Sequence, residues 1–117
     1  MDMPGLLDQG LLLFNEGKFY DAHEMWEDLW RITQETALKT SYQGLIQAAV
    51  GLHHLSHHNQ TGARSQLQKS IRNLQTGLGA PTGLDIPNLI EQLKTVLGRM
   101  QEVESPSVST VRIARLK

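Results

Sequence analysis

The stretch GKFYDAHEMWEDLW, residues 17–30, indicates the fold class of this chain. When successive residues are turned by about 100° around a helix axis, the apolar side chains gather on one face. These side chains are Phe19, Ala22, Trp26, Leu29 and Trp30. Asp21 and Asp28 project from the opposite side. A helix with one apolar face buries that face, so we predict a helix from Phe19 to about Thr33 that packs on other helices.

The segments around this stretch predict four more helices. Residues 4–16 show apolar side chains at helical spacing, and Gly17 can adopt the left-handed conformation that ends helices. Residues 34–40 are polar and indicate a linker or a frayed helix start. Residues 41–57 are apolar around most of the circumference, so this helix is expected to be central. A narrow apolar stripe predicts a peripheral fourth helix, from the turn at 58–62 to about Leu78, and Asp85 is the expected N-cap of the fifth.

Together these segments predict an all-α fold, a compact antiparallel bundle of about five helices with tetratricopeptide-like local packing. We expect a single bundle domain over residues 1–104. Residues 105–117 mix Val, Ile and Leu with Ser, Thr and Arg, which favours an extended C-terminal tail. We expect this tail to pack on another surface, such as that of a neighbouring subunit, so a homo-oligomer stays open as an interpretation.

Composition and charge narrow the classes of function. The 117 residues carry a net charge of −1, and a dedicated nucleic-acid binder or a protein drawn to anionic membranes would be more basic. The chain has no cysteine, which excludes a disulfide scaffold, a thiol nucleophile and an iron–sulfur cluster. We see no signal peptide and no apolar run of the roughly 18 residues that cross a bilayer, so a cytoplasmic protein is expected.

The first candidate for chemistry is the pair His23 and Glu27, which lie four residues apart and therefore share one flank of a helix. The run His23-Glu24-Met25-Trp26-Glu27 begins like the zinc-protease motif His-Glu-x-x-His but lacks its second histidine, so we reject that motif. A divalent metal held by His23, Glu27 and a group such as His54 stays open. The simpler interpretation is an edge histidine that is hydrogen-bonded to Glu27 or to backbone, with no cofactor.

The second candidate is a polar line on the third predicted helix, formed by Gln43, Gln47 and His54. This line faces either solvent or the second helix. In the latter case a single polar cluster would line an interhelical groove. Its members would be His23, Glu24, Glu27, Gln47 and His54, with Gln43 and Asn59 as secondary candidates.

Two further groups have a structural and a functional interpretation. His53 and His57 have a spacing that can chelate a metal, but histidines near a helix C-terminus also interact favourably with the helix dipole, which we favour. Trp26 and Trp30, with Phe19, could line an aromatic pocket, but at helical spacing we favour a role in the core.

Three motifs resemble the bacterial and archaeal family called domain of unknown function 309. They are Phe19-Tyr20-Asp21-Ala22-His23-Glu24-Met25-Trp26-Glu27 with Trp30, then Gly44-Leu45-Ile46-Gln47-Ala48-Ala49, then His54 and Asn59 with Gly62-Ala63. The resemblance covers roughly residues 10 to 80 and implies an all-helical, tetratricopeptide-like bundle. It implies no activity. The pattern of the family runs through His23, Glu24, Glu27, Trp30, Gln47, His54, Asn59 and Gly62.

Three functions fit these observations. The chain could be a module that binds a protein or peptide partner in an interhelical groove, which we favour because no catalytic motif is complete. It could be a metal-dependent enzyme of hydrolase type that uses His23 and Glu27, with Gln47 and His54 across the groove. It could hold the same residues as a buried hydrogen-bonded network that fixes helix register. No catalytic residue can be assigned from the sequence alone.

Overall fold

The computed structural model describes residues 3–101 and 111–116, and in these residues the all-α prediction is confirmed. The helices are α1 (Met3–Asn15), α2 (Phe19–Ile32), α3 (Thr36–Ser56), α4 (Gln60–Thr76) and α5 (Ile86–Met100). The tetratricopeptide-like packing stays a prediction. None of the described helices is long and apolar enough to cross a membrane.

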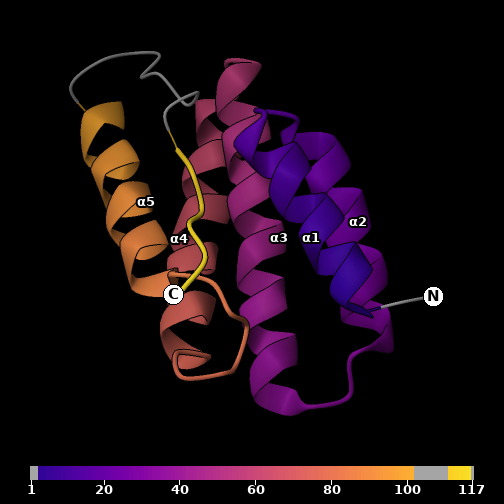
Figure 1. The fold of residues 1–117 in the computed structure, drawn as a ribbon. Coiled ribbons are helices and arrows are strands. Elements are labelled where there is room, and N and C mark those ends of the chain that lie inside the picture. Colours follow the sequence, from indigo (N-terminus) through magenta and orange to yellow (C-terminus); the bar gives the residue numbers. More distant parts are fainter. Residues whose placement is uncertain (1–2, 102–110, 117) are drawn as a thin grey trace.

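The helix α3 is central, as its apolar circumference predicted (Figure 1). It packs against α2 on one side and α4 on the other, while α1 packs on α2 and α5 on α4. The helix α4 was predicted to be peripheral, but it lies between α3 and α5. Glycines in α3 allow this close approach, because a Cβ atom at Gly44 would lie 2.7 Å from the Leu74 side chain, and one at Gly51 2.7 Å from Leu67.

For residues 34–40 the sequence predicted a linker or a frayed helix start, and the structure excludes a linker over the whole stretch because α3 already starts within it. The helix begins at Thr36 because the carboxylate of Glu35 acts as its N-cap. One carboxylate oxygen accepts the N–H of Ala37 at 3.0 Å and the other accepts that of Leu38 at 2.8 Å. These bonds satisfy two of the N–H groups that a helix start leaves without partners. The extra turn brings Lys39 alongside α2.

The core is centred on Trp26, which is 0% exposed. Its indole packs against Phe14 and donates its Nε1–H to the carbonyl of Leu7 at 3.3 Å. Gly10 makes room for the ring, because a Cβ atom there would lie 2.1 Å from Trp26 Nε1. Trp26 and Phe19 are thus core residues, as the favoured interpretation expected.

Residues 111–116 return to the bundle as an extended segment (Figure 1). Val111 and Ile113 are buried, and Leu84 forms an isolated antiparallel bridge with Arg115. In the structure this part of the predicted tail packs on its own chain. Residues 102–110 and 117 lie outside the described residues.

Candidate functional site

His23 is paired within its own helix. Its Nε2 contacts a carboxylate oxygen of Glu27, and its Nδ1 lies 3.2 Å from the carbonyl oxygen of Tyr20. The other oxygen of Glu27 accepts a hydrogen bond of 3.3 Å from Arg31, which also donates to Asp28 at 2.8 Å. The result is a chain of polar contacts along one edge of α2. Both nitrogens of His23 are engaged inside one helix, which is the geometry of the simpler interpretation given above.

The neighbour of His23 on α3 is His53 rather than His54. The ring of Tyr20 contacts both, with its centroid 5.2 Å from that of His23 and 5.3 Å from that of His53. Partial burial lowers the pKa of His53, and the neighbouring His57, His54 and His23 lower it further. Burial and nearby positive charge both disfavour the charged form of an imidazole.

The histidines at the end of α3 make capping contacts. Nδ1 of His57 lies 3.0 Å from the carbonyl oxygen of His53, which also accepts a 2.7 Å hydrogen bond from Ser56. The rings of His53 and His57 lie 4.3 Å apart. The His53 carbonyl also accepts the backbone N–H of His57 at 3.2 Å, so these side-chain contacts add to the backbone hydrogen bonds that end the helix. In residues 3–101 and 111–116, no group of three His, Asp or Glu side chains is placed to hold a metal ion.

Gln47 and His54 turn toward α4, not toward α2. Asn73 donates to Gln47 Oε1 at 2.7 Å, and Asn59 Nδ2 lies 3.3 Å from His54 Nδ1. Asn59 also caps α4 by accepting the N–H of Gly62 at 3.0 Å. Among the described residues, no hydrogen bond or ion pair joins Gln47 or His54 to the polar residues of α2. The structure therefore divides the candidate cluster into an α2 part and an α3–α4 part.

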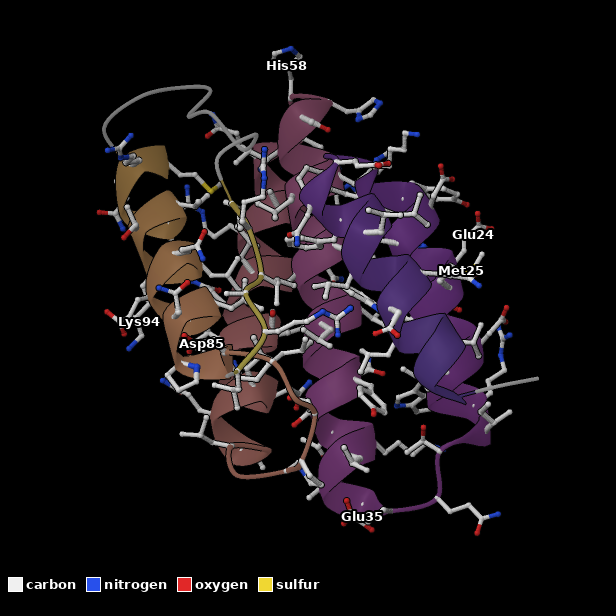
Figure 2. The ribbon with its side chains drawn as sticks, in the orientation of Figure 1. Glu24, Met25, Glu35, His58, Asp85 and Lys94 are labelled. Atoms are coloured by element: carbon white, nitrogen blue, oxygen red, sulfur yellow. The ribbon has the colours of Figure 1, made fainter. Side chains whose placement is uncertain are left out.

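Glu24 joins neither part. Figure 2 shows that it extends outward from α2, whereas the neighbouring Met25 is partly buried against the core. The Glu24 side chain is exposed to solvent and makes no ion pair within the part of the chain that the structure describes. Its position in the motif is therefore a position on the solvent side of the bundle.

Gln43 lies in a groove between α2 and α3, which we call the Trp30 groove. Two adjoining hollows form it, with cavity volumes of about 280 and 240 Å³, and both are lined by Trp30 and Gln43. The remaining lining residues are Glu27, Arg31, Gln34, Thr36, Lys39, Thr40, Ile46 and Asn73. Lys39 Nζ lies 4.1 Å from the centroid of the Trp30 ring, a cation–π contact.

The Gln43 amide makes no hydrogen bond to any described residue, although its helix is otherwise closely packed. An amide carries two donors and an acceptor, so it can bind either side of a peptide group. The groove thus offers an aromatic surface, an amide with unused donors and acceptor, and charges of both signs at its rim.

Sequence reasoning gave Trp30 mainly to the core and did not name Lys39 or Asn73. Trp30 is only half-buried, because it lies at the margin of the apolar face of α2. The signal that was available is the Glu35 carboxylate, since a cap there would have placed Lys39 and Gln43 on one helix face, four residues apart.

Comparison with known proteins gives a family but no activity. A family model described as "Domain of unknown function (DUF309)" matches residues 7–66. An uncharacterised protein of Aquifex aeolicus is 28% identical over 101 residues, which cover 86% of this chain and 30% of that protein. The uncharacterised protein YpuF of Bacillus subtilis is 32% identical over 89 residues, which cover 74% of this chain and 51% of YpuF. The chain thus spans about a third to a half of the length of these relatives.

Proposed function

The chain belongs to the family described as domain of unknown function (DUF309), and from this premise we propose that it is a binding module that holds an extended peptide segment of a protein partner in the Trp30 groove. The observation that carries the proposal is the pairing of Trp30 with Gln43. Both residues line both hollows of the groove, and the Gln43 amide has no other partner among the described residues.

Each part of the groove matches a part of a peptide. The half-buried face of Trp30 offers a large apolar surface of the kind that dominates binding energy at interfaces. The amides of Gln43 and Asn73 can donate to and accept from a peptide backbone. Lys39 lies over the Trp30 ring, and Trp30 also lines the other hollow, which Glu27 and Arg31 border. We expect a bound segment to place an apolar side chain against Trp30.

The polar residues of α2 and the α3–α4 contacts have supporting roles in this proposal. Arg31 holds Glu27 at the groove rim, while the Gln47–Asn73 bond fixes the distance between α3 and α4 next to Gln43. The rival interpretation, a metal-dependent enzyme, needs a third ligand beside His23 and Glu27. Among the described residues, no third His, Asp or Glu side chain is grouped with them.

The test is a selection of short peptides, displayed on phage, on the immobilised full chain, followed by affinity measurements with soluble peptide. A Trp30→Ala variant is expected to bind at least about 30-fold more weakly, as expected for loss of an aromatic anchor. Gln43→Ala is expected to bind about 5-fold more weakly because one or two hydrogen bonds are lost.

The matched control is Gln68→Ala, which removes an exposed amide on α4 outside the groove and should leave affinity unchanged. Circular dichroism on each variant establishes that the helices are retained. Equal binding by the Trp30→Ala and Gln68→Ala variants, with both folded, would refute the proposal. Hydrolysis of a model ester or phosphoester that is lost on His23→Ala would instead favour the enzyme.

A further inference from the structure

Two side-chain amides form hydrogen bonds to the backbone of the extended C-terminal segment, residues 111–116. Asn15, the last residue of α1, accepts the N–H of Ile113 at 2.8 Å and donates to the carbonyl of the same residue at 3.0 Å. Gln92 of α5 accepts the N–H of Arg112 at 2.9 Å and donates to its carbonyl at 2.6 Å. Such paired hydrogen bonds are made to the backbone N–H and C=O of one residue. They therefore do not depend on the side chain of that residue.

The segment alternates between buried and exposed side chains. Val111 and Ile113 are 2% and 3% exposed, whereas Arg112 and Ala114 face outward. The segment lies in a groove formed by α1, α5 and residues 83–85. The floor of this groove therefore takes an aliphatic side chain at two alternate positions of the segment. Main-chain hydrogen bonds combined with pockets for alternate side chains are the features by which proteins recognise extended peptides.

The rest of the segment is held by the loop before α5 and by an ion pair. Asp85 donates its N–H to the carbonyl of Ala114 at 2.7 Å, and Leu116 donates its N–H to the carbonyl of Gly83 at 2.9 Å. The guanidinium of Arg115 lies 2.9 Å from the carboxylate of Asp8 on α1. A basic residue two positions after the second buried aliphatic residue is thus placed to make this ion pair.

The far end of this groove is open. Leu116, which is 61% exposed, borders a hollow of about 400 Å³ lined by the loop before α5 and by the first residues of that helix. The leucine side chain therefore leaves space beside it. A larger side chain at the same position of a bound peptide would fill part of this hollow.

We propose that the groove formed by α1, α5 and residues 83–85 is a second peptide-binding site, and that residues 111–116 occupy it as an internal mimic of a partner segment. The partner is an extended peptide with aliphatic residues at alternate positions, a basic residue two positions after the second of them, and a large apolar residue next. This site is separate from the Trp30 groove, and neither proposal depends on the other.

The test compares wild-type full chain with an Ile113→Asp variant, in which the internal segment is weakened but the groove is intact. The probe is a fluorescein-labelled peptide Val-Arg-Ile-Ala-Arg-Leu, with binding followed by anisotropy. A tethered segment competes at an effective concentration on the order of 1 mM, so a peptide with Kd of about 10 µM should bind Ile113→Asp about 100-fold more tightly than wild type. A probe with Trp in place of the final Leu should bind still more tightly.

Added to the Ile113→Asp chain, Gln92→Ala should weaken binding of the probe at least about 10-fold, since two hydrogen bonds are lost. Gln75→Ala, an exposed amide on α4, is the matched control and should change nothing. If Ile113→Asp does not fold, the exposed Asp8 offers a second route. An Asp8→Arg full chain should prefer a probe with Glu in place of the second Arg over the original probe by roughly 5-fold, the reverse of the wild-type preference.

Two results overturn the proposal. One is an Ile113→Asp variant that keeps its helices but binds the probe no better than wild type. The other is tail exchange between copies without probe binding. Tail exchange can be detected with introduced cysteines, because the chain has none of its own and Leu84 pairs with Arg115 in the antiparallel bridge. Mixed Leu84→Cys and Arg115→Cys chains would then form a disulfide-linked dimer, and the occupant would be a second copy.

Discussion

At the scale of single residues, the polar side chains of the family motifs divide according to the helix that they contact. His23 and Glu27 pair along α2, whereas Gln47 and His54 pair with Asn73 and Asn59 of α4. Polar residues of one family pattern can thus make contacts on different helices, because a helix presents different positions to different sides.

The first prediction concerns His53. Its pKa in the folded chain lies below the ordinary value of 6.5, chiefly through burial and then through His57, His54 and His23. The unfolded chain therefore binds more protons between that folded pKa and 6.5, and stability falls as the pH drops through this window. We expect the melting temperature of a His53→Gln variant to change less than that of wild type between pH 7.5 and pH 5. Equal slopes would contradict this assignment, and an NMR titration of His53 measures its pKa directly.

The second prediction concerns the cap at Glu35. Hydrogen bonds from the Ala37 and Leu38 N–H groups lower the pKa of this carboxyl below its ordinary value of 4.5. The contribution of the carboxylate to stability is complete above pH 4.5 and is lost as the pH falls through the lower folded value. A Glu35→Gln variant should therefore melt below wild type at pH 6, and the difference should shrink at pH 3. Thermal melts at both values measure it, and a constant difference would rule out the charged cap.

At the scale of helices, packing depends on glycines at points of close approach. The third prediction is that Gly10→Ala destabilises the protein by about 1–3 kcal/mol, because the new methyl group overlaps the Trp26 indole. Gly98→Ala in α5 is the matched control. A Cβ atom there meets nothing within 4 Å, so this change should stabilise by about 0.5–1 kcal/mol. Urea unfolding of both variants gives the two values, which should have opposite signs.

The fourth prediction concerns the bond between α3 and α4. An Asn73→Ala change leaves the partly buried Gln47 carbonyl without its donor, which should cost about 1–2 kcal/mol of unfolding free energy. Gln75→Ala on the exposed side of α4 should stay within about 0.5 kcal/mol of wild type. A double-mutant cycle with Gln47→Ala measures the coupling. A coupling near zero would show that the two amides act independently.

Apolar spacing predicted the helices well, because burial of one face dominates their stability. It predicted a helix from Phe19 to about Thr33, which is found as Phe19–Ile32, and the central position of α3, while the N-cap preference of aspartate located the Asp85 cap. It did not give the partner of each polar residue, since helical angles relate positions on one helix but not the rotation of one helix against the next. The polar line of Gln43, Gln47 and His54 shows this: Gln43 faces the Trp30 groove, and the other two contact α4.

At the scale of the whole molecule, the C-terminal segment connects the first and the last helix of the bundle. It bonds to α1 through Asn15 and Asp8 and to α5 through Gln92, two helices that are otherwise separated by the rest of the bundle (Figure 1). The fifth prediction is that the Arg112 and Ile113 amides exchange slowly with solvent in wild type, because both are bonded to side chains. Asn15→Ala should speed exchange at Ile113 more than at helix-centre amides of α3. Hydrogen exchange followed by NMR measures both. Unchanged protection at Ile113 would contradict the role of Asn15 in holding the segment.

The central claim, that the Trp30 groove binds peptide, is tested most directly by NMR on the full, uniformly ¹⁵N-labelled chain during titration with a phage-selected peptide. The signals to follow are the Trp30 indole N–H and the Gln43 side-chain amide. We predict that both shift with the same dissociation constant, while the buried Trp26 indole stays in place. Binding that moves only the signals of Asn15 and Gln92, or that moves none of these, would contradict the claim.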